Sequence, residues 1–409
     1  MSAVRDTPSL LRHSDFGLFW TARVFSTGCF QIISVVIGWQ IYDLTRSALH
    51  LGLVGLCQFL PMLVLFIPAG HIADRFDRRT VVRCCQMVAG STGAGLAFAS
   101  WQGMISPAII FAAAVVIGAC RTFEMPTTAA LLPMIVSPRQ LPRALALSAS
   151  AIQTATIIGP ALGGLLYIVG PGPAYLFVAC FYGLASILVS RLRILVPPAA
   201  REPATLKSVF SGFSFIRSRP IILGAISLDM VAVLLGGATA LLPIYARDIL
   251  HTNAFGLGVL RASPALGALS MSLILARWPL ERRVGLKMFG AVAVFGLATI
   301  VFGLSSWFAL SLPALVVMGA ADVVSVVVRS TLVQLGTPDA MRGRVSAVNA
   351  MFVGTSNQLG EFESGLTAAL FGPVEAVVLG GLGTILVALA WSRLFKSLRD
   401  ADRFPSRSA

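Results

Sequence analysis

The residues of this chain that could most clearly bind ions or ligands are charged side chains inside long apolar stretches. One such charge costs about 2.5–3.5 kcal/mol at the centre of a bilayer by insertion scales, so each one is a candidate for ion or ligand binding. The candidates are Arg23, Arg121, Glu124, Asp229, Asp322, Arg329, Glu361 and Glu363. Asp229 lies about nine residues into its stretch, which at about 1.5 Å per residue places it near the midplane. With no base beside it in that stretch, we expect an unpaired carboxylate that could load and release a proton.

The spacing of the other charges groups them on helix faces. Arg121 and Glu124 are three residues apart, so a helix places them on one face. Asp322 and Arg329 are seven apart, also on one face. Each pair could be a structural ion pair or part of a functional site. Glu361 and Glu363 are only two apart, so they do not share a face and we expect one of them to point into a cavity.

The elements that carry these charges are membrane helices. The chain is 56% hydrophobic and 12% charged, with a mean hydropathy of +0.85, whereas soluble domains carry about 25% charged residues. A spanning helix needs about 20 apolar residues. Twelve continuous stretches meet this need, which predicts an all-α membrane protein with twelve transmembrane helices. They cover approximately residues 17–41, 50–73, 82–101, 107–132, 145–168, 174–195, 221–246, 255–276, 286–305, 308–333, 346–371 and 375–394.

Basic residues gather in every second connection between these stretches. The connections after the second, fourth, sixth, eighth and tenth stretches hold most of the Lys and Arg, and the alternate connections hold almost none. Cytoplasmic loops retain basic residues, so both termini are predicted to lie in the cytoplasm. The net charge of +14 is therefore a topology signal, and a nucleic-acid partner is not expected.

A long polar connection divides the chain into halves. It covers residues 197–220, between an N-terminal six-helix bundle at 1–196 and a C-terminal six-helix bundle at 221–409. A shift of 201 residues places Gly118 on Gly319 and Arg143 on Arg344, among other matches. Parallel repeats of this kind are typical of transporters with a site between the halves.

A dense polar loop joins the second and third stretches. Its residues include Gly70, Asp74, Arg75, Asp77, Arg78 and Arg79. We expect Gly70 to allow close helix approach and Asp74 to meet the positive N-terminus of the eleventh helix near Val345. Arg75 and Arg78 could then hold carbonyls or acids across the seam between the halves, which would make the loop a conformational latch.

Gly159, Pro160, Gly163 and Gly164 form a GPxxGG motif in the fifth stretch. Proline removes one backbone hydrogen bond and bends a helix, and the two later glycines allow tight helix contact.

Together these motifs resemble the major facilitator superfamily over essentially the whole chain. The loop resembles the superfamily's signature loop, the GPxxGG motif its antiporter motif, and Arg121 its membrane arginine. Residues 341–345 and 357–365, MRGRV and NQLGEFESG, look like the bacterial branch that contains the enterobactin exporter.

The resemblance implies an inner-membrane secondary exporter that works by alternating access and exchanges its substrate for protons. The substrate would be a siderophore or other small amphipathic molecule, and broad multidrug efflux is the alternative. Many antiporters of the superfamily carry an acid in the first helix, where this chain has Arg23, so we expect Asp229 to be the main coupling acid.

Other classes are less well supported. A non-transporting sensor or scaffold on the same fold would not need the loop motif or the buried charges. No P-loop and no cluster of nucleophile and base or of metal ligands is found in the sequence, so we expect no enzyme, metal or cofactor. The expected partners are a small-molecule substrate, protons and the lipid bilayer, and the expected state is a monomer.

Overall fold

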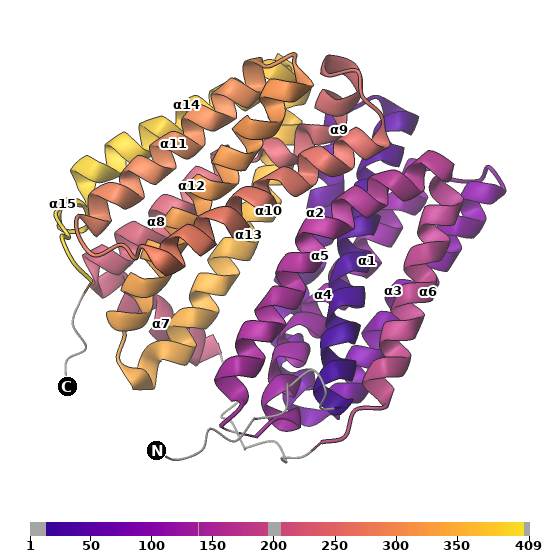
Figure 1. Ribbon diagram of the computed structural model, residues 1–409, viewed down its shortest axis with the longest axis horizontal. Helices are drawn as coiled ribbons and strands as arrows, with labels where there is room; N and C mark the ends of the chain where they lie inside the picture. Colours follow the sequence, from indigo (N-terminus) through magenta and orange to yellow (C-terminus); the bar gives the residue numbers. More distant parts are fainter. Residues whose placement is uncertain (1–13, 138, 195–205, 405–409) are drawn as a thin grey trace, which may run out of the picture. The chain divides into compact units, whose positions relative to one another are not determined.

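The computed structural model describes residues 14–137, 139–194 and 206–404, which are helical apart from short connections (Figure 1). Helix forms in each of the twelve expected stretches, although the seventh is interrupted. The first six are α1 (Ser14–Thr45), α2 (Ala48–Arg75), α3 (Arg78–Trp101), α4 (Pro107–Ile135), α5 (Leu141–Val169) and α6 (Pro171–Ser190). The later ones are α8 (Pro220–Leu235), α10 (Ala254–Arg277), α11 (Val284–Leu304), α12 (Phe308–Leu335), α13 (Asp339–Phe371) and α14 (Pro373–Leu394). The all-α fold predicted from the sequence is confirmed for the described residues.

Ten of the described helical segments are long and apolar enough to cross a membrane by length and composition. α3 and α13 fall outside that set because they are richer in small and polar residues. In α3 the small residues allow close packing against a neighbouring helix. A side chain on Gly93 would lie 3.3 Å from the carbonyl oxygen of Tyr175, so α3 and α6 pack closely along their length (Figure 1).

The helix boundaries follow the internal repeat. α4 begins at Pro107 and α12 at Phe308, the 201-residue shift read from the sequence. α5 and α13, and then α6 and α14, follow in the same order.

The seventh stretch is not one straight helix, which corrects the prediction of a continuous 221–246. α8 ends at Leu235, and a 3₁₀ turn η2 (Ala238–Leu241), a short helix α9 (Leu242–Ile244) and a π-helical turn η3 (Tyr245–Ile249) follow. The break falls at Gly236–Gly237, where a side chain on Gly236 would lie 2.6 Å from the ring of Phe295. Gly237 packs against the backbone of Gly360 in α13 in the same way. The regular helix is thus interrupted where its backbone packs closely against Phe295 and Gly360.

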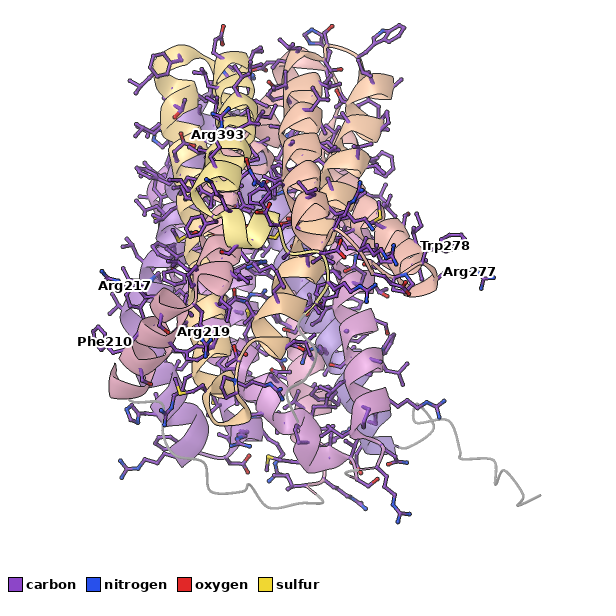
Figure 2. The ribbon with its side chains drawn as sticks, turned by 90° about the vertical axis from the view of Figure 1, so that its left-hand side faces the viewer. Phe210, Arg217, Arg219, Arg277, Trp278 and Arg393 are labelled. Carbon is purple, nitrogen blue, oxygen red and sulfur yellow. The ribbon has the colours of Figure 1, made fainter. Side chains whose placement is uncertain are left out.

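The polar connection contains a helix that the sequence did not predict, α7 (Leu206–Ser218). Gly212 and Ile216 are turned inwards: Ile216 is buried, and a side chain on Gly212 would lie 2.9 Å from the carbonyl oxygen of Arg344 in α13. Phe210 and Arg217 project from the opposite side, and Trp278 projects from the end of α10 (Figure 2). Aromatic and basic residues exposed in this way are typical of helix ends at a membrane surface.

The chain forms two compact units. The first unit holds Met1–Val36 and Leu60–Pro203, and the second holds Ile37–Phe59 and Ala204–Ala409. This division differs from the expected six-plus-six bundles because the ends of α1 and α2 that meet at their shared turn group with the second unit. The domain limits 1–196 and 221–409 therefore remain a prediction.

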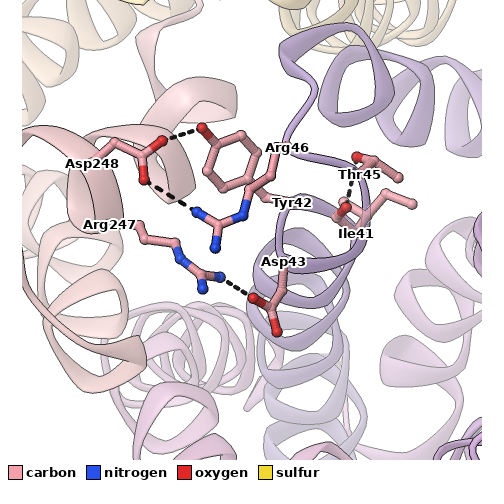
Figure 3. Close-up of polar contacts among 7 residues, drawn as sticks. All are labelled: Ile41, Tyr42, Asp43, Thr45, Arg46, Arg247 and Asp248. Carbon is pink, nitrogen blue, oxygen red and sulfur yellow. Dashed lines mark hydrogen bonds and ion pairs between the residues drawn. The ribbon is translucent and has the colours of Figure 1, made fainter.

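Polar contacts explain why the α1–α2 turn groups with the second unit. Asp43 forms an ion pair with Arg247, and Arg46 Nη1 lies 3.5 Å from Oδ1 of Asp248 (Figure 3). The Tyr42 hydroxyl donates a hydrogen bond to Asp248 as well. We call these five residues the α1–α2 turn cluster. Close to this turn in the chain, Gly52 packs against the backbone of α13 at Phe362 and Gly365.

Candidate functional site

The first unit holds a buried polar cluster built from α1, α3 and α4. Glu124 on α4 is 6% exposed and accepts two hydrogen bonds at the same oxygen, Oε1. One comes from the Ser26 hydroxyl on α1 and the other, at 2.9 Å, from Nε2 of Gln86 on α3. Three helices therefore hold this carboxylate in one orientation.

Arg121 and Glu124 lie on one face of α4, as predicted, but their side chains turn to different partners. The Arg121 guanidinium lies 3.8 Å from the centre of the Phe30 ring, a cation–π contact. Of the two alternatives for this pair, the structural ion pair is not seen among the described side chains, where Phe30 covers the face of the Arg121 guanidinium.

A cavity of about 80 Å³ opens beside this cluster. Its polar lining includes Arg23, Gln86, Arg121, Glu124 and Thr128, and its apolar lining includes Phe19, Met125 and Ile152. One water needs roughly 10–15 Å³ of such space, so this cavity can hold several waters or a small polar group. We call it the Arg23–Arg121 cavity.

The second unit holds a drier charged cluster. Asp229 on α8 and Arg329 on α12 form an ion pair at 3.1 Å, and both side chains are 5% exposed. The expectation of an unpaired Asp229 is therefore wrong. Its partner comes from another helix, which inspection of its own stretch could not reveal.

Asp322 joins the same cluster. It lines a cavity of about 10 Å³ together with Asp229, Ser325 and Phe295. That space is enough for about one water and too small for a substrate. Arg329 also donates a hydrogen bond to Oδ1 of Asn349 on α13 at 3.3 Å. Arg329 thus pairs with Asp229, and a second carboxylate, that of Asp322, lines the same small cavity as Asp229.

Glu361 and Glu363 point different ways, as their spacing predicts. Glu363 accepts a hydrogen bond from Thr367 on its own helix at 2.8 Å. Glu361 lies against α2. A side chain on Gly55 in α2 would come within 2.7 Å of Oε2 of Glu361. The positive charge of Arg261 on α10 attracts the carboxylate of Glu361.

Several side chains of the loop between α2 and α3 contact residues of the first unit. Asp77 begins α3 by accepting a hydrogen bond from the backbone N–H of Arg79 at 2.8 Å and pairs with the Arg79 guanidinium. The hydrogen bond from Arg79 holds the pKa of Asp77 below its usual value. Arg78 donates to the carbonyl oxygen of Ala130 on α4 at 3.3 Å, so this contact lies inside one unit and not across the seam.

The other loop residues give no support for a latch in this structure. A side chain on Gly70 would meet no described atom within 4 Å, so the close helix approach predicted there is not present. Arg75 is exposed. The side chain of Asp74 lies outside the described residues. The latch therefore stays a prediction.

The GPxxGG motif lies where α5 packs on α1. A side chain on Gly159 would lie 2.7 Å from Cβ of Gln31, and one on Gly163 would lie 3.0 Å from the carbonyl oxygen of Ile32. Pro160 and Gly164 are buried in the same stretch of α5. The motif brings two helix backbones together, as its composition predicts.

Sequence reasoning missed several residues of these sites. Arg261 lies inside the predicted span 255–276, so the search for charges in apolar stretches should have found it. The Gly236–Gly237 pair was a visible sign of a helix break. By contrast, Gln86 and Ser26 carry no signal, because uncharged polar residues are common in membrane helices.

A helical repeat, close glycine contacts and buried charges in each unit define a membrane transporter of the major facilitator fold. The chain belongs to the transmembrane secretion effector family, whose sequence profile matches residues 7–408. The similar proteins named below are transporters and not enzymes.

Curated relatives resemble the chain along nearly its whole length. The enterobactin exporter EntS of Citrobacter koseri is 28% identical over 399 residues, which cover 96% of this chain and 94% of that protein. EntS of Escherichia coli K12 is 26% identical over 405 residues, with 97% and 96% covered.

Solved structures agree on the fold. A bacterial homologue of the human lysosomal transporter Spinster, solved in an inward-facing unoccupied conformation, has a TM-score of 0.78 at 13% identity. It covers 98% of this chain and 99% of its own. The nucleoside transporter NupG has a TM-score of 0.67 at 15% identity, and the match covers 93% of this chain and 99% of that one.

Proposed function

We propose that this protein is a proton-coupled exporter of a small amphipathic molecule of the siderophore type. It would work in the bacterial inner membrane, as a monomer with both termini in the cytoplasm. Similarity to enterobactin exporters over 96–97% of the chain supports export of a siderophore-like substrate. The packing of the GPxxGG motif on α1 supports export, because this motif is typical of exporters.

The observation that carries proton coupling is the charge balance of the second unit. Asp229 and Asp322 line one nearly dry cavity, and Arg329 supplies a single positive charge to it. When both acids are ionised, the cluster holds one uncompensated negative charge, which is costly in a water-poor interior. Binding of one proton removes that charge. We therefore extend the coupling role from Asp229 alone to the pair Asp229 and Asp322.

A change in protonation would also change packing. Arg329 bridges Asp229 on α8 and Asn349 on α13, so the strength of its pairing affects two helices next to the break at Gly236–Gly237. A discontinuous helix beside a titrating group is a common arrangement in transporters. The proton would in this way bias the conformation of the helices that form the transport path.

The test uses purified full-length protein in proteoliposomes with an imposed pH gradient and labelled enterobactin, the molecule named for the similar exporters. We expect the gradient to drive accumulation by the wild type and to have no effect on Asp229→Asn together with Asp322→Asn. The double variant should still exchange substrate down its concentration gradient. Undiminished gradient-driven accumulation by the double variant would remove these acids from the mechanism.

Two other outcomes identify the competing functions. Gradient-driven transport of several unrelated hydrophobic cations, without transport of the siderophore, would indicate broad multidrug efflux. If no compound of either class moves in any variant, while the protein remains folded, a non-transporting sensor or scaffold would be the better description.

A further inference from the structure

The Arg23–Arg121 cavity has a charge imbalance opposite to that of the second unit. Arg23 and Arg121 both line it, and Glu124 is the only carboxylate among the described residues that do so. Glu124 is held by Ser26 and Gln86 and is not in an ion pair with Arg121. One positive charge in this cavity is therefore uncompensated.

Polar atoms without partners gather around the same space. Nε of Arg23, Oε1 of Gln86 and Oγ1 of Thr128 are buried and make no hydrogen bond within the described part of the chain. All three residues line the cavity. Buried polar atoms are rarely left unpaired, because each costs about 1–3 kcal/mol, so three such atoms around one cavity favour the binding of water or of another polar group there.

The side chains that line the cavity offer more hydrogen-bond donors than acceptors. Two guanidinium groups and the Thr128 hydroxyl can donate hydrogen bonds, whereas Gln86 Oε1 can accept one. An anionic oxygen group accepts from guanidinium donors strongly, often through two parallel hydrogen bonds. The space of about 80 Å³ admits such a group, but not the body of a drug-sized molecule.

We propose that the Arg23–Arg121 cavity binds the anionic oxygen group, a carboxylate or phenolate, of the exported molecule. The apolar part of that molecule would pack on the neighbouring Phe19, Met125 and Ile152 side chains. Arg23 is the residue that decides this selectivity, because its Nε has no other partner. The proposal rests on the proposed export function for its biological role, but its binding test stands alone.

The test measures binding of benzoate and of its neutral isostere benzamide to the purified full-length protein by equilibrium dialysis at pH 7.5. We expect benzoate to bind at least about tenfold more tightly than benzamide, since hydrogen bonds to a charged group are worth about 1.5–3 kcal/mol. Arg23→Gln should remove this preference by weakening benzoate binding alone. Arg23→Lys should restore part of it.

Two controls make the result decisive. Arg393→Gln removes an arginine at the end of α14, so it tests whether loss of any positive charge has the same effect. Thermal unfolding of each variant shows whether Arg23→Gln remains folded. Equal binding of benzoate and benzamide by the wild type, or a full preference in a folded Arg23→Gln variant, would overturn the inference.

The outcome is separable from that of the transport test. A protein that prefers benzoate through Arg23 but moves no substrate would retain the anion site and lose the export proposal. A protein that exports siderophore yet binds both probes equally would retain the export proposal and lose the anion site.

Discussion

Arg329 is the arginine on which the charged cluster of the second unit depends. Its Nη1 lies 3.1 Å from Asp229 and 3.3 Å from Asn349, while its Nε is buried without a partner. Arg329 stabilises the fold only as long as the carboxyl group of its partner Asp229 is ionised. Its removal would leave two carboxylates in a nearly dry cavity.

We therefore expect Arg329→Ala to lower the free energy of unfolding by about 3–5 kcal/mol, because it leaves a buried charge uncompensated. Adding Asp229→Asn to Arg329→Ala should recover part of that loss, because one of the two uncompensated carboxylates is then removed. Thermal unfolding in detergent measures both, with Arg393→Ala at the end of α14 as the control. Equal losses in the single and double variants would show that the two residues do not stabilise one another.

Asp77 gives a residue-scale prediction that depends on pH. Its pKa is lowered by Arg79, so its contribution to stability is complete above the unfolded value of about 4 and is lost as the pH falls through the folded pKa. Asp77→Asn keeps a good N-cap for α3 but loses the ion pair. The stability gap between wild type and Asp77→Asn should therefore be at most about 1 kcal/mol at pH 7, since the pair is partly exposed. It should shrink towards pH 3. A gap that does not change over this range would contradict the assignment.

At the scale of helices, glycines decide which elements approach closely. α5 reaches α1 at Gly159 and Gly163, and α8 stops where Gly236 and Gly237 meet α11 and α13. At Gly163 and Gly237 the neighbour is in part backbone, which cannot rotate away.

Gly163→Ala should therefore lower the unfolding temperature and the transport rate, because the new methyl would lie 3.0 Å from the Ile32 carbonyl oxygen. The matched control is Gly183→Ala in α6, where a side chain would meet nothing within 4 Å. Alanine is a better helix former than glycine by about 1 kcal/mol, so the control should be neutral or more stable. Similar behaviour of the two variants would show that the α5–α1 contact tolerates a side chain.

The helices were predictable from the sequence to within a few residues, since membrane spans depend mainly on continuous hydrophobicity. The partners of the buried charges were not. Asp229 was identified as a candidate, but its pairing with Arg329 links residues far apart in the chain. The turn of Arg121 onto Phe30 depends on the packing of α1 against α4. The helix α7 was missed because its short amphipathic pattern lies in a polar connection, and short helices give weak signals.

On the scale of the whole molecule, the α1–α2 turn cluster joins residues 37–59 to the rest of the second unit. It combines two ion pairs of opposite polarity: the turn supplies Asp43 and Arg46, and η3 supplies Arg247 and Asp248 (Figure 3). Such an alternating arrangement favours one register of the turn over a shifted one, because a shift would bring like charges together.

Reversal of one pair tests this role. Asp43→Arg places two positive charges opposite each other and should reduce both thermal stability and transport rate. Combining it with Arg247→Asp restores opposite charges and should recover most of the loss. The side chains of Arg247 and Asp43 are 28% and 44% exposed, so the effect on stability should not exceed about 1 kcal/mol. A swapped variant as impaired as Asp43→Arg alone would show that the pair has no role of its own.

The Asp229–Arg329 ion pair also sets an order of events during synthesis. One hundred residues separate the two partners. A ribosome that adds about 5–20 residues per second needs roughly 5–20 s between them, and in that interval α8 holds an acid without its base. Until α12 arrives, α8 therefore carries a charge without its partner, which costs about 2.5–3.5 kcal/mol at the centre of a bilayer.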